Sequence, residues 1–379
     1  MTRILLTGGG SGGHIYPLLA VTEELKSIAS KNQLELEIHY LGPQDAYTYA
    51  LQGAGIITHG LSAGKIRRYL AGFLANMIDI PRFFWGLIQA WWKMFRLMPD
   101  AVFSKGGPGA LPVVLVAWFY RIPIIVHDSD SVPGLTNLLS GRFAKKIAVS
   151  FESAQKYFPL NKVIITGNPV RNSLLTNRLE PGAAKSQLGF DENLPLTLIL
   201  GGSQGAVRIN ESVVLALKDL LPMTQVLHQT GQANLADTKK LARTAMMDSP
   251  LKDAAASRYK AVPYFENDLH IAMSAADLIV SRAGSGNIFE IAAFGKPAIL
   301  IPLPEAANDH QRLNAYEFTK MGGGVVIEQP NLLPGIFVRQ IQEILNNPQL
   351  AEKMHNASST FFKPDASRLI AEAVLGLVK

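Results

Sequence analysis

The chain has 379 residues, of which 48% are hydrophobic and 17% are charged, enough for two compact domains with little disorder. It contains no cysteine, which excludes disulfides, thiolate metal sites and thiol catalysis. The formal net charge of +6 is modest, and we expect no nucleic-acid partner. We also expect neither a signal peptide nor a membrane-spanning helix, because no apolar stretch reaches about 20 residues.

The first half of the chain alternates short apolar segments with longer segments of helical spacing. Arg3–Thr7 predicts a strand that runs into the glycine loop 8–13, and helical spacing follows over Tyr16–Ala29. Further strands are predicted at Leu34–Leu41, Ala101–Ser104, Ile122–His127 and Lys146–Ser150. Strands that alternate with helices predict a parallel sheet with right-handed crossovers.

The same pattern starts again with a strand at Leu196–Leu200, a glycine loop and a helix. The later strands are predicted at Gln225–Gln229, Tyr259–Val262, Leu278–Ser281 and Ala298–Pro302. The repetition predicts an α/β protein of two doubly wound, Rossmann-like domains. Gly and Pro in 166–171 place the boundary there, giving domains 1–165 and 166–362. The amphipathic C-terminal helix, within 363–379, is expected to pack back on the first domain.

Gly8, Gly10 and Gly13 form a G-x-G-x-x-G loop between a strand and a helix. Such a loop can direct backbone amides at an anion, or it can simply permit a tight turn. A dinucleotide cofactor is disfavoured because the second strand ends at 40–43 without the carboxylate that would hold its ribose. His14, at the helix start, is either a neutral general base or a cap, and its position alone favours neither.

The second half carries three polar clusters at predicted strand ends. Ser203 lies in the loop 201–205, where its hydroxyl and the local amides can bind phosphate. Glu290 follows a glycine turn and suits a ribose diol, although a favourable interaction with the helix dipole explains it equally. The cluster 308–311 with Asn314 lies where α/β sheets bind ligands, or it is a solvated helix start.

Together these segments resemble the MurG family of peptidoglycan N-acetylglucosaminyltransferases. The matching stretches are 7–21, 103–117, 125–139, 166–171, 200–210, 228–234 and 281–315. The resemblance implies the two-domain GT-B fold, with the active site in the cleft between the domains. It further implies inverting transfer of N-acetylglucosamine from UDP-N-acetylglucosamine to the C4 hydroxyl of lipid I (undecaprenyl-pyrophosphoryl-N-acetylmuramyl-pentapeptide), giving lipid II, with no cofactor and no metal.

The resemblance assigns the donor to the second domain. Ser203 and its loop would hold the pyrophosphate, Glu290 the ribose hydroxyls, and Gln311 with Asn314 the N-acetylglucosamine. The complete implied donor set is Arg171, Ser203, Gln204, Gly205, Arg282, Gly284, Glu290, Gln311 and Asn314.

The acceptor is assigned to the first domain, with His14 or Asp128 as the catalytic base. The acceptor-binding set is Gly12, Gly13, Gly106, Gly107, Asp130 and Asn137. Two stretches depart from the usual family pattern. His-Asp-Ser-Asp at 127–130 replaces His-Glu-Gln-Asn, which leaves open whether Asp128 or Asp130 takes the acceptor-side role. Lys105–Gly109 replaces a glycine-aromatic loop.

Residues 65–96 are rich in aromatic and basic side chains, which is typical of helices that lie in the headgroup region of anionic membranes. Pro81 is expected to divide this stretch into two helices. The predicted membrane residues are Arg67, Arg68, Phe73, Arg82, Phe83, Phe84 and Trp85. Crossover helices must also bury one face, so the aromatics can instead be core residues. With a lipid-carried acceptor, we expect a peripheral protein on the cytoplasmic face of the plasma membrane.

Two other functions stay open. One is a related glycosyltransferase that acts on another lipid, such as diacylglycerol. The other is a nucleotide-sugar-binding or epimerase-like protein without a lipid acceptor, which the aromatic and basic stretch disfavours. Other cell-wall synthesis proteins are additional candidate partners.

Overall fold

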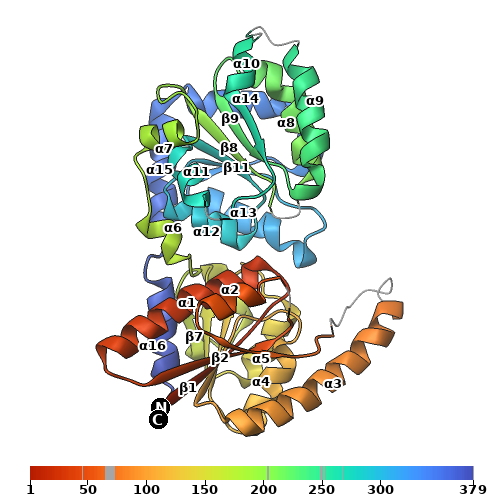
Figure 1. Cartoon of the computed structure of the whole chain (residues 1–379), viewed down its shortest axis with the longest axis vertical. Coiled ribbons are helices and arrows are strands. Elements are labelled where there is room, and N and C mark those ends of the chain that lie inside the picture. Colours follow the sequence, from red (N-terminus) through yellow and green to blue (C-terminus); the bar gives the residue numbers. More distant parts are fainter. Residues whose placement is uncertain are drawn as a thin grey trace. The chain divides into compact units, whose positions relative to one another are not determined.

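The computed structural model describes residues 1–44, 46–64, 73–202, 205–247, 251, 253–266 and 268–378, with only the backbone described for 73–78 and 253. These residues form two compact units (Figure 1). Unit 1 comprises Met1–Asn172 and Lys363–Lys379, and unit 2 comprises Ser173–Phe362. The linker motif 166–171 therefore belongs to unit 1, somewhat beyond the predicted boundary at 165.

Unit 1 is built on a seven-stranded sheet of order β3-β2-β1-β4-β5-β6-β7, and all its neighbouring strands pair in parallel. The order runs outward in both directions from β1 and β4, which is the doubly wound arrangement. The strands are β1 (Thr2–Thr7), β2 (Leu36–Gly42), β3 (Ile57–Gly60), β4 (Ala101–Ser104), β5 (Ile124–Asp128), β6 (Lys146–Val149) and β7 (Val163–Ile165).

Helices cover both faces of this sheet because alternate strand side chains point to opposite sides. Ile4 and Leu6 of β1 join one buried cluster with α1 and α16, whereas Leu5 joins another with α3 and α4. The helices are α1 (Gly12–Lys31), α2 (Thr48–Gly53), α3 (Phe73–Leu97), α4 (Ala110–Phe119), α5 (Leu135–Phe143), η2 (Glu152–Tyr157), η3 (Leu160–Lys162) and α16 (Ala366–Leu375).

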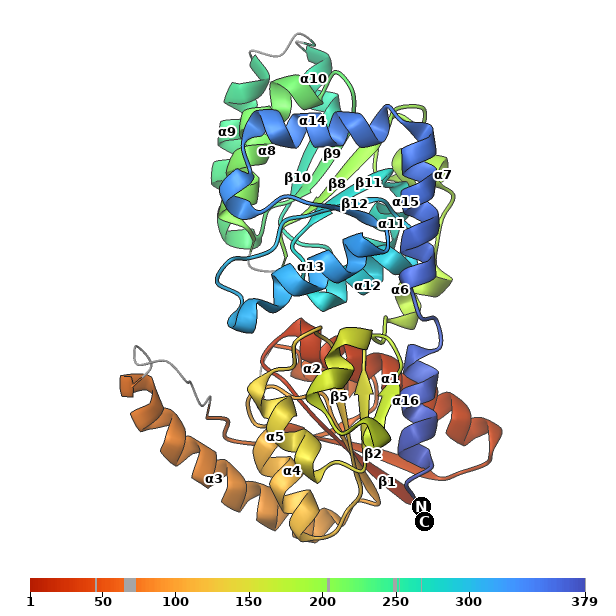
Figure 2. The ribbon, with the colours of Figure 1, turned by 180° about the vertical axis from the view of Figure 1, so that it is seen from behind.

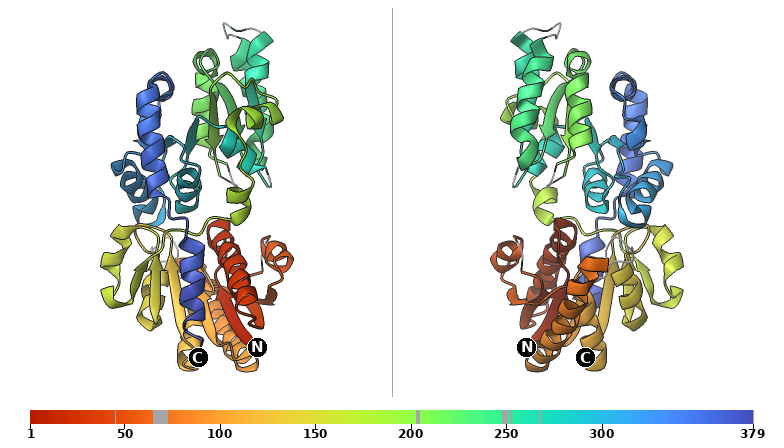
Figure 3. Two further views of the ribbon diagram at one scale, coloured as in Figure 1. Left: turned by 90° about the vertical axis from the view of Figure 1, so that its left-hand side faces the viewer. Right: turned by 90° about the vertical axis from the view of Figure 1, so that its right-hand side faces the viewer.

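The C-terminal helix α16 lies beside α1 in unit 1 (Figures 2 and 3). Ile370 and Val374 are fully buried in the cluster that also holds Leu18 and Val21 of α1. The chain reaches α16 past Gly167, where an added Cβ would lie 2.6 Å from Cβ of Lys363. Gly167 also has φ +80°, so both the space and the backbone conformation favour glycine there.

Unit 2 has a six-stranded parallel sheet of order β10-β9-β8-β11-β12-β13, which repeats the same topology. Its strands are β8 (Leu196–Leu200), β9 (Gln225–Gln229), β10 (Tyr259–Val262), β11 (Leu278–Ser281), β12 (Ala298–Leu300) and β13 (Gly324–Val326). Its helices are α6 (Asn172–Thr176, which begins at the unit boundary), α7 (Pro181–Gln187), α8 (Val207–Leu220), η4 (Gln232–Asn234), α9 (Leu235–Met247), α10 (Asp253–Arg258), α11 (Leu269–Ala275), α12 (Ser285–Ala293), η5 (Ala307–Asp309), α13 (His310–Lys320), η6 (Gln329–Asn331), α14 (Pro334–Leu345) and α15 (Pro348–Phe361).

Three strands were not predicted from the sequence, and all three lie at sheet edges. They are β3, β7 and β13. Each has only three or four residues, and most of their side chains are exposed or partly exposed. A short strand with one pairing partner needs no continuous apolar run, so its sequence gives little signal.

The expected helix break at Pro81 is wrong, because α3 runs from Phe73 to Leu97 through this proline. Proline removes one helical hydrogen bond but does not prevent packing on either side of it. Farther along, the Gln89 side chain accepts a hydrogen bond from the backbone NH of Ser62 at 2.8 Å. Arg3 donates to the carbonyl oxygen of Leu97 at 3.2 Å. These contacts hold the part of α3 after Pro81 against unit 1.

No helix in the described part of the chain is long and apolar enough to cross a membrane.

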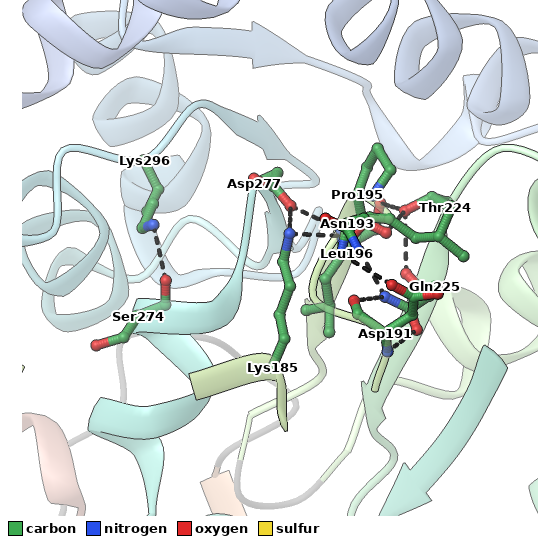
Figure 4. A network of polar contacts seen from close by, with 12 residues as sticks. Lys185, Asp191, Asn193, Pro195, Leu196, Thr224, Gln225, Ser274, Asp277 and Lys296 are labelled. Atoms are coloured by element: carbon green, nitrogen blue, oxygen red, sulfur yellow. Dashed lines mark hydrogen bonds and ion pairs between the residues drawn. The ribbon is translucent and has the colours of Figure 1, made fainter. Parts of the chain in front are cut away.

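An ion pair stabilises the start of the unit 2 sheet (Figure 4). Lys185 of α7 is buried, and its ammonium lies 2.8 Å from Asp277 and donates to the carbonyl oxygen of Leu194 at 2.9 Å. Asp277 also accepts from the backbone NH of Leu196, the first residue of β8. This one carboxylate therefore connects α7 to the central strand of the sheet.

We expect Lys185→Met to lower the free energy of unfolding by about 1–3 kcal/mol, because it leaves Asp277 and a carbonyl without their buried donor. All four tryptophans lie in unit 1, so tryptophan fluorescence reports unit 1 and circular dichroism reports both units. Urea denaturation should show a lower midpoint by circular dichroism and a smaller change by fluorescence. Lys218→Met, at an exposed position of α8, is the control. Equal losses in the two variants would contradict the role of the ion pair.

Candidate active site

Parallel pairing places the predicted site residues of each unit at one sheet edge. In unit 1, Thr7 at the end of β1 pairs with Ser104 at the end of β4. In unit 2, Leu200 at the end of β8 pairs with Ser281 at the end of β11. Strand order reverses direction at both points, and such switch points are where open α/β sheets bind ligands.

The first glycine loop follows β1 and turns directly into α1. Gly9 and Gly10 have φ of +134° and +89°, which glycine adopts readily. An added Cβ on Gly9 would lie 2.7 Å from the hydroxyl of Tyr40, and this hydroxyl donates to the carbonyl oxygen of Gly8 at 2.6 Å. Tyr40 on β2 thus holds the glycine loop 8–13 in place through this hydrogen bond. Gly12 and Gly13 form the first turn of α1.

His14 lies in the first turn of α1, as predicted, with Ser11 as its partner. The Ser11 hydroxyl and the imidazole Nδ1 are 3.0 Å apart. Burial, and secondarily the positive charge of Lys105, lower the pKa of His14 to about 4, while Asp130 opposes this shift. The imidazole is therefore neutral near pH 7 and can accept a proton.

The loop after β4 brings Gly106 and Gly107 against the other acceptor candidates. A Cβ on Gly107 would lie 3.1 Å from Nε2 of His14, and one on Gly106 would lie 2.3 Å from Oδ1 of Asn137. Both glycines have φ above +80°. The structure therefore joins His14, Gly106, Gly107 and Asn137 into one small region.

Asp128 ends β5 and is held on both carboxylate oxygens. Oδ1 accepts from the backbone NH of Asp130 at 2.9 Å, and Oδ2 accepts from the Asn137 amide at 2.8 Å. The side chain is buried, and burial, followed by the nearby charge of Asp130, raises the pKa of Asp128 to about 6. Asp130 itself is only partly buried.

Sequence reasoning did not include Lys105 among the site residues, although it included the loop that Lys105 begins. The lysine is 3% exposed, and its ammonium donates to the hydroxyl of Ser129, which in turn donates to Asn168 at 3.1 Å. Burial lowers the pKa of Lys105, whereas Asp128 and Asp130 raise it. The available signal was a lysine directly after a short and largely apolar predicted strand, which the structure buries completely.

The second glycine loop in unit 2 is anchored at both ends. Gly201 donates to the carbonyl oxygen of Gln229 at 3.1 Å, and the Gln229 side chain donates to the carbonyl oxygen of Gly202 at 2.8 Å. A Cβ on Gly205, where φ is +79°, would lie 2.2 Å from the carbonyl oxygen of Thr230. The predicted residues Ser203 and Gln204 lie outside the described residues.

A buried polar chain behind this loop was also missed by sequence reasoning. His228 contacts Asn210 through Nε2 at 3.0 Å and the Tyr259 hydroxyl through Nδ1 at 3.1 Å. Asn210 donates to the carbonyl oxygen of Thr230 at 3.0 Å. Burial lowers the pKa of His228 to about 3, so this histidine is a neutral structural residue. The pairing of β9 with β10 brings His228 near Tyr259, and Asn210 reaches His228 from α8.

Arg282 follows β11 and is bound to its own unit. Its guanidinium donates to the carbonyl oxygens of Ile301 and Pro302 at 3.1 and 3.3 Å, and to the side chain of Gln329 at 2.7 Å. Burial lowers its pKa, with Glu305 opposing the shift. Arg282 therefore shapes the segment after β12.

The remaining donor candidates lie on α12 and α13. Gly284 is the N-cap residue of α12, and Glu290 lies on the second turn of this helix, partly buried. The Gln311 side chain accepts from the backbone NH of Leu303 at 3.0 Å. Asn314 is fully buried and donates to the carbonyl oxygen of Ala283 at 3.3 Å, so it ties α13 to the loop before α12.

Arg171, predicted on the donor side, lies in unit 1. Its guanidinium is 4.0 Å from the ring centroid of Tyr16 on α1, a cation–π contact. Tyr16 in turn meets Tyr47 edge to face at 5.8 Å. The linker arginine is therefore packed against the helix that carries His14.

The predicted membrane segment forms an exposed apolar face in unit 1. We call this surface the aromatic face: Ile80, Phe84, Trp85, Ile88, Trp91, Trp92 and Phe95 of α3, with Trp118 and Phe119 of α4, each 46–66% exposed. Arg82 has an exposed side chain beside it, whereas Phe83 is partly buried. Arg67 and Arg68 lie outside the described residues, as does the side chain of Phe73.

Among the residues that the structure describes, no three His, Asp or Glu side chains are placed to share a metal ion.

Comparisons with known proteins cover nearly the whole chain. Residues 4–149 match the glycosyltransferase family 28 N-terminal domain, and residues 196–370 match the glycosyltransferase family 28 C-terminal domain. A Bacillus cereus protein named UDP-N-acetylglucosamine–N-acetylmuramyl-(pentapeptide) pyrophosphoryl-undecaprenol N-acetylglucosamine transferase 2 is 36% identical, over 92% of this chain and 93% of that protein.

Solved structures give the same result for the fold. The crystal structure of Acinetobacter baumannii MurG is similar with a TM-score of 0.75 and 27% identity, covering 99% of this chain and 100% of that one. A UDP-GlcNAc 2-epimerase from Neisseria meningitidis, bound to UDP-GlcNAc, has a TM-score of 0.70 over 99% of this chain and 100% of that one. Its 15% identity shows a shared fold only.

Two family domains match in order, a relative is 36% identical over 93% of its length, and both units have the Rossmann-like fold of GT-B proteins. The chain therefore belongs to glycosyltransferase family 28 and, within it, to the MurG family.

Proposed function

We propose that this chain transfers N-acetylglucosamine from UDP-N-acetylglucosamine to the C4 hydroxyl of lipid I and so makes lipid II. The observation that carries the proposal is 36% identity over 92% of the chain to a transferase of that name. Unit 1 supplies the acceptor residues and unit 2 the donor residues. An epimerase-like function is not favoured, because the epimerase likeness rests on 15% identity.

His14 is the better placed of the two candidate bases. Its imidazole is partly accessible and neutral, and Nε2 faces Gly107. Asp128 is 2% exposed, and both its oxygens already accept hydrogen bonds. When the Ser11 hydroxyl accepts from Nδ1–H, Nε2 is left as the proton acceptor. Asp128 then positions Asn137 and the turn to Asp130.

The reaction is a single displacement. The C4 oxygen of the acceptor bonds to the anomeric carbon of N-acetylglucosamine, its proton passes to Nε2 of His14, and the bond to the β-phosphate of UDP breaks with its electron pair on the phosphate. The attack comes from the face opposite UDP, so the configuration inverts. Amides of the loop 201–205 and the α8 N-terminus stabilise the negative charge of the leaving UDP.

The donor residues divide into contacts and supports. Glu290 binds the ribose hydroxyls, and Gln311 reaches the N-acetylglucosamine. Ser203, Gln204, Gly205 and Gly284 contribute to the phosphate-binding loops. Arg282 and Asn314, both bonded to backbone carbonyls, hold the segments that line the site. The reaction takes place without a metal or cofactor.

We further propose that the aromatic face attaches unit 1 to an anionic membrane and that the protein works at the cytoplasmic face of the plasma membrane. Exposed aromatic side chains cover one side of α3, and the cations Arg82, Lys93 and Arg96 lie on the same helix. The single acidic residue of α3, Asp79, is buried. Such helices bind where apolar area and anionic headgroups act together. Other cell-wall synthesis proteins remain proposed partners.

Transfer itself is measured with radiolabelled UDP-N-acetylglucosamine and a short-chain lipid I analogue in the presence of EDTA. We expect lipid II product from the native chain and a turnover about 10²–10⁴-fold lower from His14→Gln, the scale of a lost general base. The donor dissociation constant should stay unchanged in this variant. Product from diacylglycerol instead of lipid I would overturn the proposed acceptor, and unchanged turnover would remove His14 as the base.

Glu290→Gln should weaken UDP-N-acetylglucosamine binding by about 10–100-fold, because hydrogen bonds to a charged group contribute about 1.5–3 kcal/mol. Isothermal titration calorimetry measures this directly. Glu343→Gln, on the exposed side of α14, is the matched control and should bind as the native chain does. Native affinity in Glu290→Gln would leave the carboxylate with a purely structural role in α12.

Serine at both Trp85 and Ile88 should reduce binding to phosphatidylglycerol vesicles about tenfold or more, since each buried apolar side chain contributes about 1.5–3 kcal/mol. Co-sedimentation at two salt concentrations measures both contributions, and added salt should weaken binding by the native chain. Serine at Leu215 and Leu241, which are 63% and 54% exposed in unit 2, is the control. Equal loss in the two double variants would argue against the aromatic face.

A further inference from the structure

Unit 1 buries an unusual set of ionisable groups beside the proposed base. Lys105 follows β4, Asp128 ends β5 with Asp130 two residues later, and His14 lies in the first turn of α1. Lys105 and Asp128 are 3% and 2% exposed. Buried charges are costly unless they are paired, so this set must be close to electrical balance.

The hydrogen bonds fix the lysine within this set. Its ammonium donates to the Ser129 hydroxyl, and Ser129 donates to Asn168 in the linker motif. Ser129 lies between the two aspartates in sequence, so the bond holds the ammonium at the turn that carries both carboxylates. Asp130 donates its backbone NH to Asp128 within the same turn.

We propose that Lys105 is a positioning residue of the transfer reaction, whose buried ammonium offsets the two carboxylates near His14 and so lets an anionic acceptor bind beside this histidine. The inference rests on the proposed function, because it concerns the approach of a diphosphate-bearing acceptor. Without the ammonium, the two carboxylates would leave a surplus of negative charge where that acceptor must bind.

The charges near one another support this balance. Lys105 lowers the pKa of His14 and Asp130 raises it. Asp130 raises the pKa of Asp128 and Lys105 lowers it. Burial, followed by the charge of Lys105, holds the pKa of buried His127 well below the usual value. The guanidinium of Arg171 stacks on Tyr16 of α1.

The ammonium therefore acts on both candidate bases in the same direction. Removing it should raise the pKa of His14 above about 4 and that of Asp128 above about 6. A base with a higher pKa is protonated at higher pH, so the acidic limb of the pH–rate profile should move to higher pH. A lysine that only filled space would leave this limb unchanged when methionine replaced it.

The experiment compares Lys105→Met, which keeps the volume, with Lys105→Arg, which keeps the charge. Histidine-selective ¹⁵N NMR on the whole chain without substrates follows the titration of His14, and His14→Gln assigns its signal. In Lys105→Met we expect the titration midpoint to rise by about one pH unit, the usual effect of a nearby charge. In Lys105→Arg it should stay near the native value.

The transfer assay on the same variants measures the consequence for the acceptor. Lys105→Met should show an acidic limb at higher pH and a KM for the lipid I analogue about tenfold higher. Its donor dissociation constant should not change. Adding Asp130→Asn to Lys105→Met restores the balance of charge, so the His14 midpoint and the acidic limb should return toward native values. Lys146→Met, at the start of β6, is the control for loss of a lysine in unit 1.

The possible results separate the two hypotheses. If the native chain transfers sugar but Lys105→Met keeps the native pH profile and His14 midpoint, the inference fails and the proposed function stands. If the native chain makes no lipid II, the proposed function is wrong, and the proposed role of Lys105 in the transfer reaction is wrong as well. If Lys105→Met does not fold, by circular dichroism, Lys105→Gln serves in its place with the same expected results.

Discussion

Parallel pairing of the first and fourth strands is the constraint on which the rest of this structure depends. The register of β1 on β4 sets Thr7 opposite Ser104, and that of β8 on β11 sets Leu200 opposite Ser281. The paired strands therefore end at the same edge of the sheet. At this edge the backbone amides of the following loops and the first turns of the helices form no hydrogen bonds within the sheet. Glycines with positive φ are needed there because the chain turns at once into a helix.

In unit 1 this geometry concentrates charge in a buried place. His14 in the first turn of α1, Lys105 after β4 and Asp128 at the end of β5 meet at this edge, and the carboxylate and the ammonium are almost inaccessible to water. Burial shifts the pKa values of these groups from their ordinary range. The pKa of His14 is lowered, so its imidazole is neutral, and the pKa of Asp128 is raised, so its carboxyl group is harder to ionise. Chemistry at this edge is therefore controlled by the balance among neighbouring charges rather than by any one residue.

Unit 2 repeats the fold with a different use of polar groups. Arg282, Asn314 and Asn210 donate to backbone carbonyls of their own unit and hold the segments after β12, β11 and β9 respectively. In the half that we assign to the nucleotide sugar, polar side chains thus bind backbone carbonyls, whereas the half assigned to the acceptor relies on ionisable side chains. The aromatic face of α3 adds an apolar surface to the acceptor half only.

The sequence by itself determined the two Rossmann-like halves, the glycine loops and the family, because apolar periodicity and closely spaced motifs are local signals. It also predicted His14 at the start of a helix and Asp128 directly after a strand, and the structure places both near Asn137 and the loop after β4. It missed the edge strands β3, β7 and β13, whose partial exposure weakens the pattern, and it wrongly divided α3 at Pro81, through which the helix continues. The contacts of Lys105 with Ser129, and of His228 with Asn210, join residues 24 and 18 positions apart. Only the order of strands in the sheet decides such contacts, and strand order is a property of the tertiary structure.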